Sequence, residues 1–148
     1  MQVALSSIPA ISAEPPAPIS SRTRWAGRVL TALPALALLF DAAGKLAQPA
    51  PVVEACARLG ISPDAAFAIG LIEIACVALY VLPRTAVLGA VLLTGFLGGA
   101  VAIHLRIGDP LPSHTLFPIY VGAVCWVGVY LRDARVRAVA KALLGGQR

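Results

Sequence analysis

The feature that most constrains this chain is a set of four long apolar runs, separated by short stretches that carry charged, Pro and Gly residues. A helix crosses a hydrocarbon core of about 30 Å with roughly 20 residues, and each run comes close to that length. The mean hydropathy is +0.85 and charged residues make up only 13% of the chain. Because one soluble core of 148 residues could not bury so much apolar surface, we predict an all-α integral membrane protein, a four-helix bundle.

The bounds of these runs predict the domain organisation. Residues 1–24 are rich in Pro, Ser and Ala, and we expect a disordered cytoplasmic tail there. Ser62 and Pro63 are typical of a helix start, and we expect a loop over 44–63 before them. The four transmembrane helices are predicted over about 25–43, 64–82, 85–105 and 115–131.

The distribution of Lys and Arg predicts the orientation. One side of the predicted bundle carries nine of these residues and the other carries three, Lys45, Arg58 and Arg106. By the positive-inside rule the side with nine is cytoplasmic, so both termini are expected in the cytoplasm. The basic segment 132–148 is either a helix lying on anionic lipid or a solvated tail. The net charge of +5 does not indicate nucleic-acid binding, because the cations sit at the ends of apolar runs.

The remaining polar side chains gather at the non-cytoplasmic side. Ionisable groups at membrane depth are costly and usually face the interior of a bundle, so they are functional candidates by default. The set comprises Asp41, Lys45, Glu54, Arg58, Glu73, His104, Arg106, Asp109 and His114.

Glu73 is the most informative of these residues, because it lies nine residues into the second predicted helix, near the bilayer centre. A bare carboxylate cannot face lipid, so Glu73 is either protonated or paired inside the bundle. It is then either part of a functional site or a structural hydrogen bond between helices.

The other candidates lie at helix ends. Asp41 and Lys45 are four residues apart, which places them on one helical face where they can pair. They are either part of a binding site or a common surface ion pair. His104 and Arg106 end the third helix, where a histidine also often makes only local hydrogen bonds. No metal site is predicted, because His104 and His114 do not have a known metal spacing and the three cysteines include no CxxC motif.

Gly95 and Gly99 form a GxxxG pair in the third predicted helix. This pattern allows close approach of a second helix, and we expect it to serve packing within the bundle, with a homo-oligomer as the alternative.

The order of these motifs resembles the DoxX-like family of small four-helix membrane proteins, over about 25–131. The resemblance implies a fold in the bacterial inner membrane with Gly44, Lys45, Glu73 and His104 as recurrent polar positions. Some relatives are membrane subunits of a thiosulfate:quinone oxidoreductase, so a quinone is one candidate ligand class, although the resemblance implies much less about activity than about fold. The motifs are Phe40-Asp41-Ala42-Ala43-Gly44-Lys45-Leu46, Gly70-Leu71-Ile72-Glu73, His104 at the end of the third helix, and an Asp-Pro loop before the last helix.

Two functions follow as hypotheses. In the first, Asp41, Lys45 and Arg106 line an outward-facing cavity for a quinone or another small polar head group, and Glu73 and His104 form a proton relay. In the second, the chain is a non-enzymatic partner that assembles with or stabilises another membrane or periplasmic protein. A transporter is disfavoured, because four short helices leave little room for alternating access.

Overall fold

A computed structural model describes residues 19–145, and the segments 1–18 and 146–148 lie outside the described residues. Most of the predicted N-terminal tail therefore falls outside the part described. Within residues 19–145 every element is helical. The helices are α1 (Ser21–Ala47), α2 (Ala50–Arg58), α3 (Pro63–Val81), α4 (Ala86–Arg106), α5 (Phe117–Arg132) and α6 (Ala134–Gly145), with a π-helical turn η1 (Leu111–Thr115) before α5.

The all-α membrane fold predicted from the apolar runs is confirmed. Four helical segments, Ser21–Ala47, Pro63–Val81, Ala86–Arg106 and Leu111–Arg132, are long and apolar enough to cross a membrane. Between 28% and 33% of the most apolar stretch of each is buried inside the protein, so most of the apolar surface of these helices is left for lipid. The termini of the helices follow local signals, and Ser62 caps α3 through a hydrogen bond from the Ala65 amide, as its sequence predicts.

The expectation of a loop over 44–63 is wrong in its middle, where α2 forms. The loop was expected because this segment is rich in Pro and Gly, but Pro51 occupies the first turn of α2, where its missing N–H costs nothing. The side chain of Cys56 is buried, so this short helix packs against the bundle through an apolar residue. The signal for α2 was present in the sequence as apolar residues at helical spacing after a proline.

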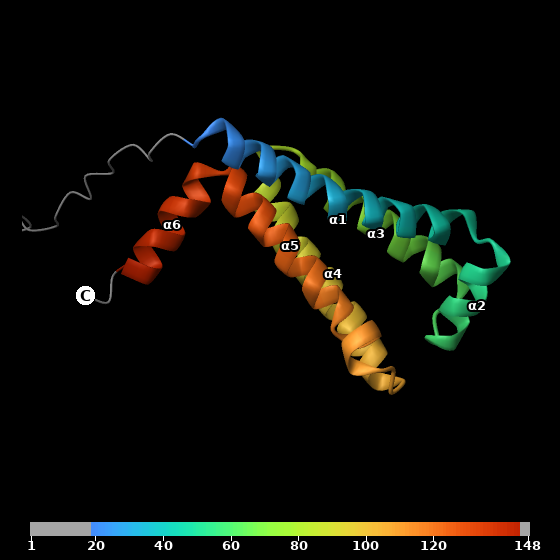
Figure 1. Ribbon diagram of the computed structural model, residues 1–148. Coiled ribbons are helices and arrows are strands. Elements are labelled where there is room, and N and C mark those ends of the chain that lie inside the picture. Colours follow the sequence, from blue (N-terminus) through green and yellow to red (C-terminus); the bar gives the residue numbers. More distant parts are fainter. Residues whose placement is uncertain (1–18, 146–148) are drawn as a thin grey trace, which may run out of the picture.

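The four long helices form two pairs that diverge (Figure 1). α1 packs on α3 and α5, α3 packs on α4, and α4 packs on α5. The pairs α1–α3 and α4–α5 meet at the end where α1 begins and α5 finishes, which we call the closed end (Figure 1). They separate toward α2 and the η1 turn, which we call the open end. The apolar core between them includes Tyr80, Leu93 and Val129, all fully buried.

Single glycines, and not the Gly95–Gly99 pair, allow the closest contacts between helices. A Cβ added to Gly89 of α4 would lie 2.2 Å from the Tyr80 backbone nitrogen of α3, and one added to Gly128 of α5 would lie 2.9 Å from Thr31 Oγ1 of α1. A Cβ added to Gly95 or Gly99 would meet nothing within 4 Å in the described chain. The predicted use of this pair within the bundle is therefore wrong, and its use in a homo-oligomer stays a prediction.

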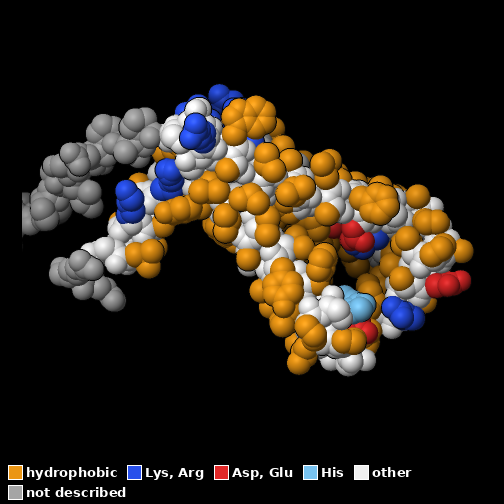
Figure 2. Space-filling model, in the orientation of Figure 1, with side chains coloured by type: hydrophobic (Ala, Val, Ile, Leu, Met, Phe, Trp, Pro, Cys, Tyr) orange, Lys and Arg blue, Asp and Glu red, His pale blue; other side chains and the backbone are white. Residues whose placement is uncertain are grey.

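The basic segment after α5 forms the helix α6. Asp133 precedes it, and its Oδ1 accepts a hydrogen bond from the Arg135 amide at 2.8 Å, which satisfies a free N–H of the first turn. α6 leaves the bundle at the closed end (Figure 1). Lys and Arg side chains gather at this end of the molecule (Figure 2).

Candidate functional site

Three of the predicted site residues come together near the open end. Lys45 of α1 donates to Glu73 Oε2 of α3 at 2.8 Å, and it also pairs with Asp41 one turn earlier in α1. We call Asp41, Lys45 and Glu73 the polar triad. Its side chains become more buried from Asp41 to Glu73: Asp41 is 59% exposed, Lys45 is 14% exposed and Glu73 is fully buried. The Glu73 side chain faces the interior of the protein, as predicted from its depth in the membrane.

The close approach of α1 and α3 depends on Gly70, one turn before Glu73. A Cβ at this position would lie 2.4 Å from Leu46 Cδ1, 3.2 Å from the Ala42 carbonyl oxygen and 3.2 Å from Lys45 Cβ. A larger residue at position 70 would therefore require the Leu46 side chain to move and α1 to shift by a few tenths of an ångström. Because Gly70 and Glu73 lie three residues apart on one helical face, this contact also determines how near Lys45 comes to the carboxyl group.

The charges of the polar triad do not balance. Two carboxylates share one ammonium, so with all three groups ionised the triad carries one negative charge in excess. The second oxygen of Glu73, Oε1, is buried and has no hydrogen-bond partner among the described residues. A buried carboxylate oxygen without a partner is costly. The site is therefore suited to accept a proton or a hydrogen bond at Glu73.

An aromatic side chain of the other helix pair faces the triad. Lys45 Nζ lies 5.8 Å from the centre of the Phe96 ring of α4, within the range of a cation–π contact. The surface between the two helix pairs is hollowed at the open end, and Figure 2 shows acidic and basic side chains on one wall of this hollow and histidine on the other. We call it the open-end hollow. Phe96 was not among the predicted site residues, because nothing in its sequence context separates it from other apolar residues of α4.

His104 belongs to a second polar group, at the end of α4. Its Nδ1 lies 2.5 Å from Asp109 Oδ2, and its ring centre lies 6.1 Å from that of His114. The hydroxyl of Ser113 lies 2.8 Å from His114 Nδ1. No hydrogen bond or ion pair joins His104 to the polar triad in residues 19–145. A proton relay from Glu73 through His104 would therefore need water or a ligand between them.

Arg106 connects the two sides of the open end. Its guanidinium donates to the Leu59 carbonyl oxygen at the end of α2, with a distance of 2.6 Å. Gly60 has a φ of +71° there, and a Cβ on it would lie 3.1 Å from Arg106 Nη2, so glycine both makes the turn and leaves room for the guanidinium. Arg106 thus binds backbone at the rim of the hollow, and among the described residues it makes no hydrogen bond or ion pair with the triad.

The described residues hold no group of three or more His, Cys, Asp and Glu side chains arranged to bind a metal ion. Cys56, Cys76 and Cys125 are all buried with free thiols. The polar groups near the open-end hollow are therefore the ammonium of Lys45 as a donor, the exposed carboxylate of Asp41 as an acceptor, the buried carboxyl group of Glu73 behind Lys45, and the histidines at the rim.

The chain is similar to known proteins at the level of a family model. Searches among curated proteins and among solved structures returned no match. A family model described as the DoxX-like family matches residues 29–128, which include α1 from its third turn, the whole of α3 and α4, and most of α5. The match contains every residue of the polar triad as well as His104 and Arg106. It spans more than half of the chain, and the protein is therefore a member of the DoxX-like family.

Proposed function

We propose that the open-end hollow binds the polar head group of a small lipid-soluble ligand of the quinone class, and that the protein is a membrane component of a redox system. The observation that carries this proposal is the polar triad, in which a fully buried carboxyl group lies behind a lysine shared by two carboxylates. A purely structural hydrogen bond between helices needs no excess charge and no unpartnered oxygen.

The donor set fits such a ligand. A quinone carries carbonyl oxygens that accept hydrogen bonds, and it takes up protons when it is reduced. Lys45 supplies a donor on the wall of the hollow, and Phe96 supplies an apolar ring beside it. Glu73, 2.8 Å behind Lys45 Nζ, is positioned to hold a proton and exchange it through the lysine.

The groups at the rim complete the proposal. His104 with Asp109 would exchange protons with the aqueous side, and Arg106 would supply positive charge at the mouth. The positive-inside rule supports an orientation with the open end outward and both termini in the cytoplasm. In that orientation the triad opens to the periplasmic side of a bacterial inner membrane, where we place this multi-pass protein.

The test is binding of a short-chain benzoquinone analogue to the purified protein in detergent, measured by calorimetry. Glu73→Gln keeps the shape of the side chain and is expected to weaken binding by about tenfold, the loss of one charge-assisted hydrogen bond. The matched control is Glu54→Gln on the same end of the molecule, in α2, which should bind as the parent does. If Glu73→Gln changes stability and membrane insertion while binding persists, Glu73 is structural and the proposal fails.

A second candidate function is assembly with another membrane protein, and the exposed glycines of α4 favour it. Gly95 and Gly99 share one face of the helix with open space in front of them, which would let a partner helix or a second copy approach closely. Crosslinking in native membranes tests this function. A stoichiometric partner that is lost in Gly99→Leu, together with an unaltered phenotype in Glu73→Gln, would favour assembly over ligand binding.

A further inference from the structure

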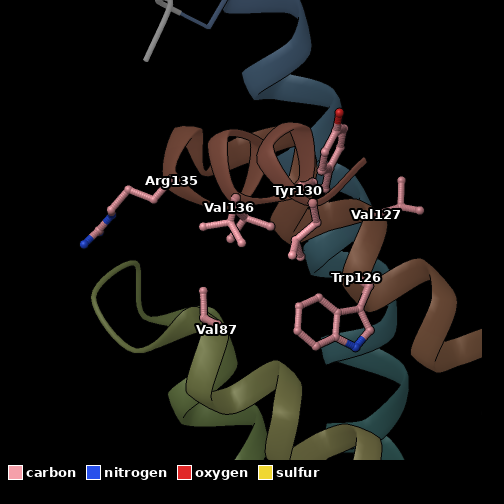
Figure 3. Close-up of a pocket in the computed structure, with 9 residues that line it drawn as sticks. Val87, Trp126, Val127, Tyr130, Arg135 and Val136 are labelled. Atoms are coloured by element: carbon pink, nitrogen blue, oxygen red, sulfur yellow. The ribbon is translucent and has the colours of Figure 1, made fainter. Parts of the chain in front are cut away.

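A second hollow lies at the closed end, far along the bundle from the polar triad. It is an apolar groove with a volume of about 630 Å³, between the first turn of α4, the end of α5 and one face of α6. Figure 3 shows Val87 of α4, Trp126 and Tyr130 of α5, and Val136 of α6 around it. We call it the α6 groove. Its volume lies within the range of about 300–1,000 Å³ that is usual for ligand pockets.

The chemistry of the α6 groove suits hydrocarbon. The indole N–H of Trp126 donates to Thr94 Oγ1 at 2.9 Å, so the ring offers the groove only apolar surface. Arg135 is the one charged residue that lines the groove. A bound water needs two to four polar partners, which these walls do not supply. In a membrane, an apolar groove beside an amphipathic helix is filled by a lipid chain.

The charge around the groove selects the headgroup. α6 turns Val136, Val139 and Ala140 to the groove, while Arg137 and Lys141 point away from that face, by about 110° and about 150° around the helix axis. Arg135 stands at the edge of the groove and extends outward from it (Figure 3), with its side chain 80% exposed. Its Nε lies 3.7 Å from Asp133 Oδ1, and the exposed guanidinium keeps further N–H donors for a phosphate. Lys and Arg side chains gather at this end (Figure 2), so the local field attracts anionic lipid.

We propose that the α6 groove binds one acyl chain of an anionic phospholipid, and that Arg135 at its edge contacts the phosphate of that lipid. The site holds α6 against α4 and α5 through the bound chain. It does not depend on the function proposed for the open end, because none of its residues belongs to the polar triad or contacts it.

The experiment uses the quenching of Trp126 fluorescence by phospholipid with brominated acyl chains. The full chain carries two tryptophans, so Trp25→Phe leaves Trp126 as the single reporter. The protein is purified in detergent and titrated with brominated phosphatidylglycerol or brominated phosphatidylcholine. We expect saturable quenching by phosphatidylglycerol at one lipid per protein and weaker binding of phosphatidylcholine. Native mass spectrometry counts the bound lipid independently.

Two pairs of variants separate the groove from general contact with the micelle. Ala140→Phe places a ring in the groove and should abolish saturable quenching, whereas Ala138→Phe, on the exposed side of α6, should not. Arg135→Gln should weaken binding of phosphatidylglycerol about fivefold, as expected for one interfacial cation, and weaken binding of phosphatidylcholine less, because its choline cation offsets the phosphate charge. Lys141→Gln is its control.

The proposal is overturned by quenching that rises without saturation, by equal affinity for the two lipids, or by identical behaviour of Ala140→Phe and Ala138→Phe. Loss of fold in Ala140→Phe would appear in circular dichroism, and the Arg135→Gln result then decides, since this exposed side chain can be changed without disturbing the core.

Discussion

Lys45 should contribute more to stability than Glu73, although the two form one ion pair. Lys45→Met removes the single cation of the triad and leaves two carboxylates facing each other, one of them fully buried. Removing one partner of a buried pair usually costs about 3–5 kcal/mol, because the other charge stays uncompensated. Glu73→Gln leaves the pair of Lys45 with Asp41 intact, and the amide oxygen can still accept from Lys45. Its cost should be about 1–2 kcal/mol.

A double variant tests whether the uncompensated carboxylate of Glu73 causes the loss of stability in Lys45→Met. With Lys45→Met and Glu73→Gln combined, the remaining charge is Asp41, which is 59% exposed and can reach water or headgroups. The double variant should therefore be more stable than Lys45→Met alone, with a coupling energy of about 1–3 kcal/mol.

The assay is equilibrium unfolding in mixed dodecylmaltoside and sodium dodecylsulfate, followed by far-ultraviolet circular dichroism. Equal destabilisation by the two single variants, or additivity in the double variant, would refute the idea that one buried ammonium serves two carboxylates. The Asp41→Asn variant gives a further check, because it should behave like Glu73→Gln or more mildly.

Three other outcomes follow from the helix contacts. Gly89→Ala should destabilise by about 1–3 kcal/mol, because its Cβ would overlap the Tyr80 backbone, while Gly95→Ala should be neutral or slightly stabilising in the same unfolding assay. Arg106→Ala removes the hydrogen bond to the Leu59 carbonyl, so spin labels on α2 and on the turn after α4 should show a longer and broader distance distribution by pulsed electron resonance. Tyr80→Phe removes a buried hydrogen bond from its hydroxyl to a carbonyl of α5, 3.1 Å long, and should cost about 1 kcal/mol.

The triad could be predicted from the sequence because its geometry follows from helical spacing and helix direction. Asp41 and Lys45 share a face by their spacing of four residues. Antiparallel packing brings the end of the first span beside the start of the next, and a carboxyl group at membrane depth has to turn inward. These rules required no knowledge of the angle between helices, and they predicted the shared face of Asp41 and Lys45 and the inward orientation of Glu73. That Glu73 meets Lys45 and not His104 is known only from the structure.

The prediction that His104 and Arg106 share one cavity with Glu73 has no such basis in helical spacing. Their positions depend on how far the two helix pairs diverge, and that divergence comes from packing at the closed end. Gly89 is not part of any motif, yet its backbone contact holds α3 and α4 together there. Both residues also bind local partners instead of the triad. His104 hydrogen-bonds to Asp109, and Arg106 donates to the Leu59 carbonyl oxygen.

The two ends of the molecule are held together by different kinds of contact, and this bears on where a ligand could enter. The buried apolar cluster and the contacts of Gly89 and Gly128 tie all four long helices together toward the closed end. At the open end the two helix pairs are bridged by polar contacts instead, namely Arg106 on the Leu59 carbonyl and Lys45 beside Phe96. Side-chain contacts of this kind can break and reform without disturbing a packed core. At the closed end the helices share a packed core, so one helix cannot shift without displacing its neighbours. A bound head group could therefore widen or narrow the open-end hollow at a lower cost in free energy than it could move the helices at the closed end.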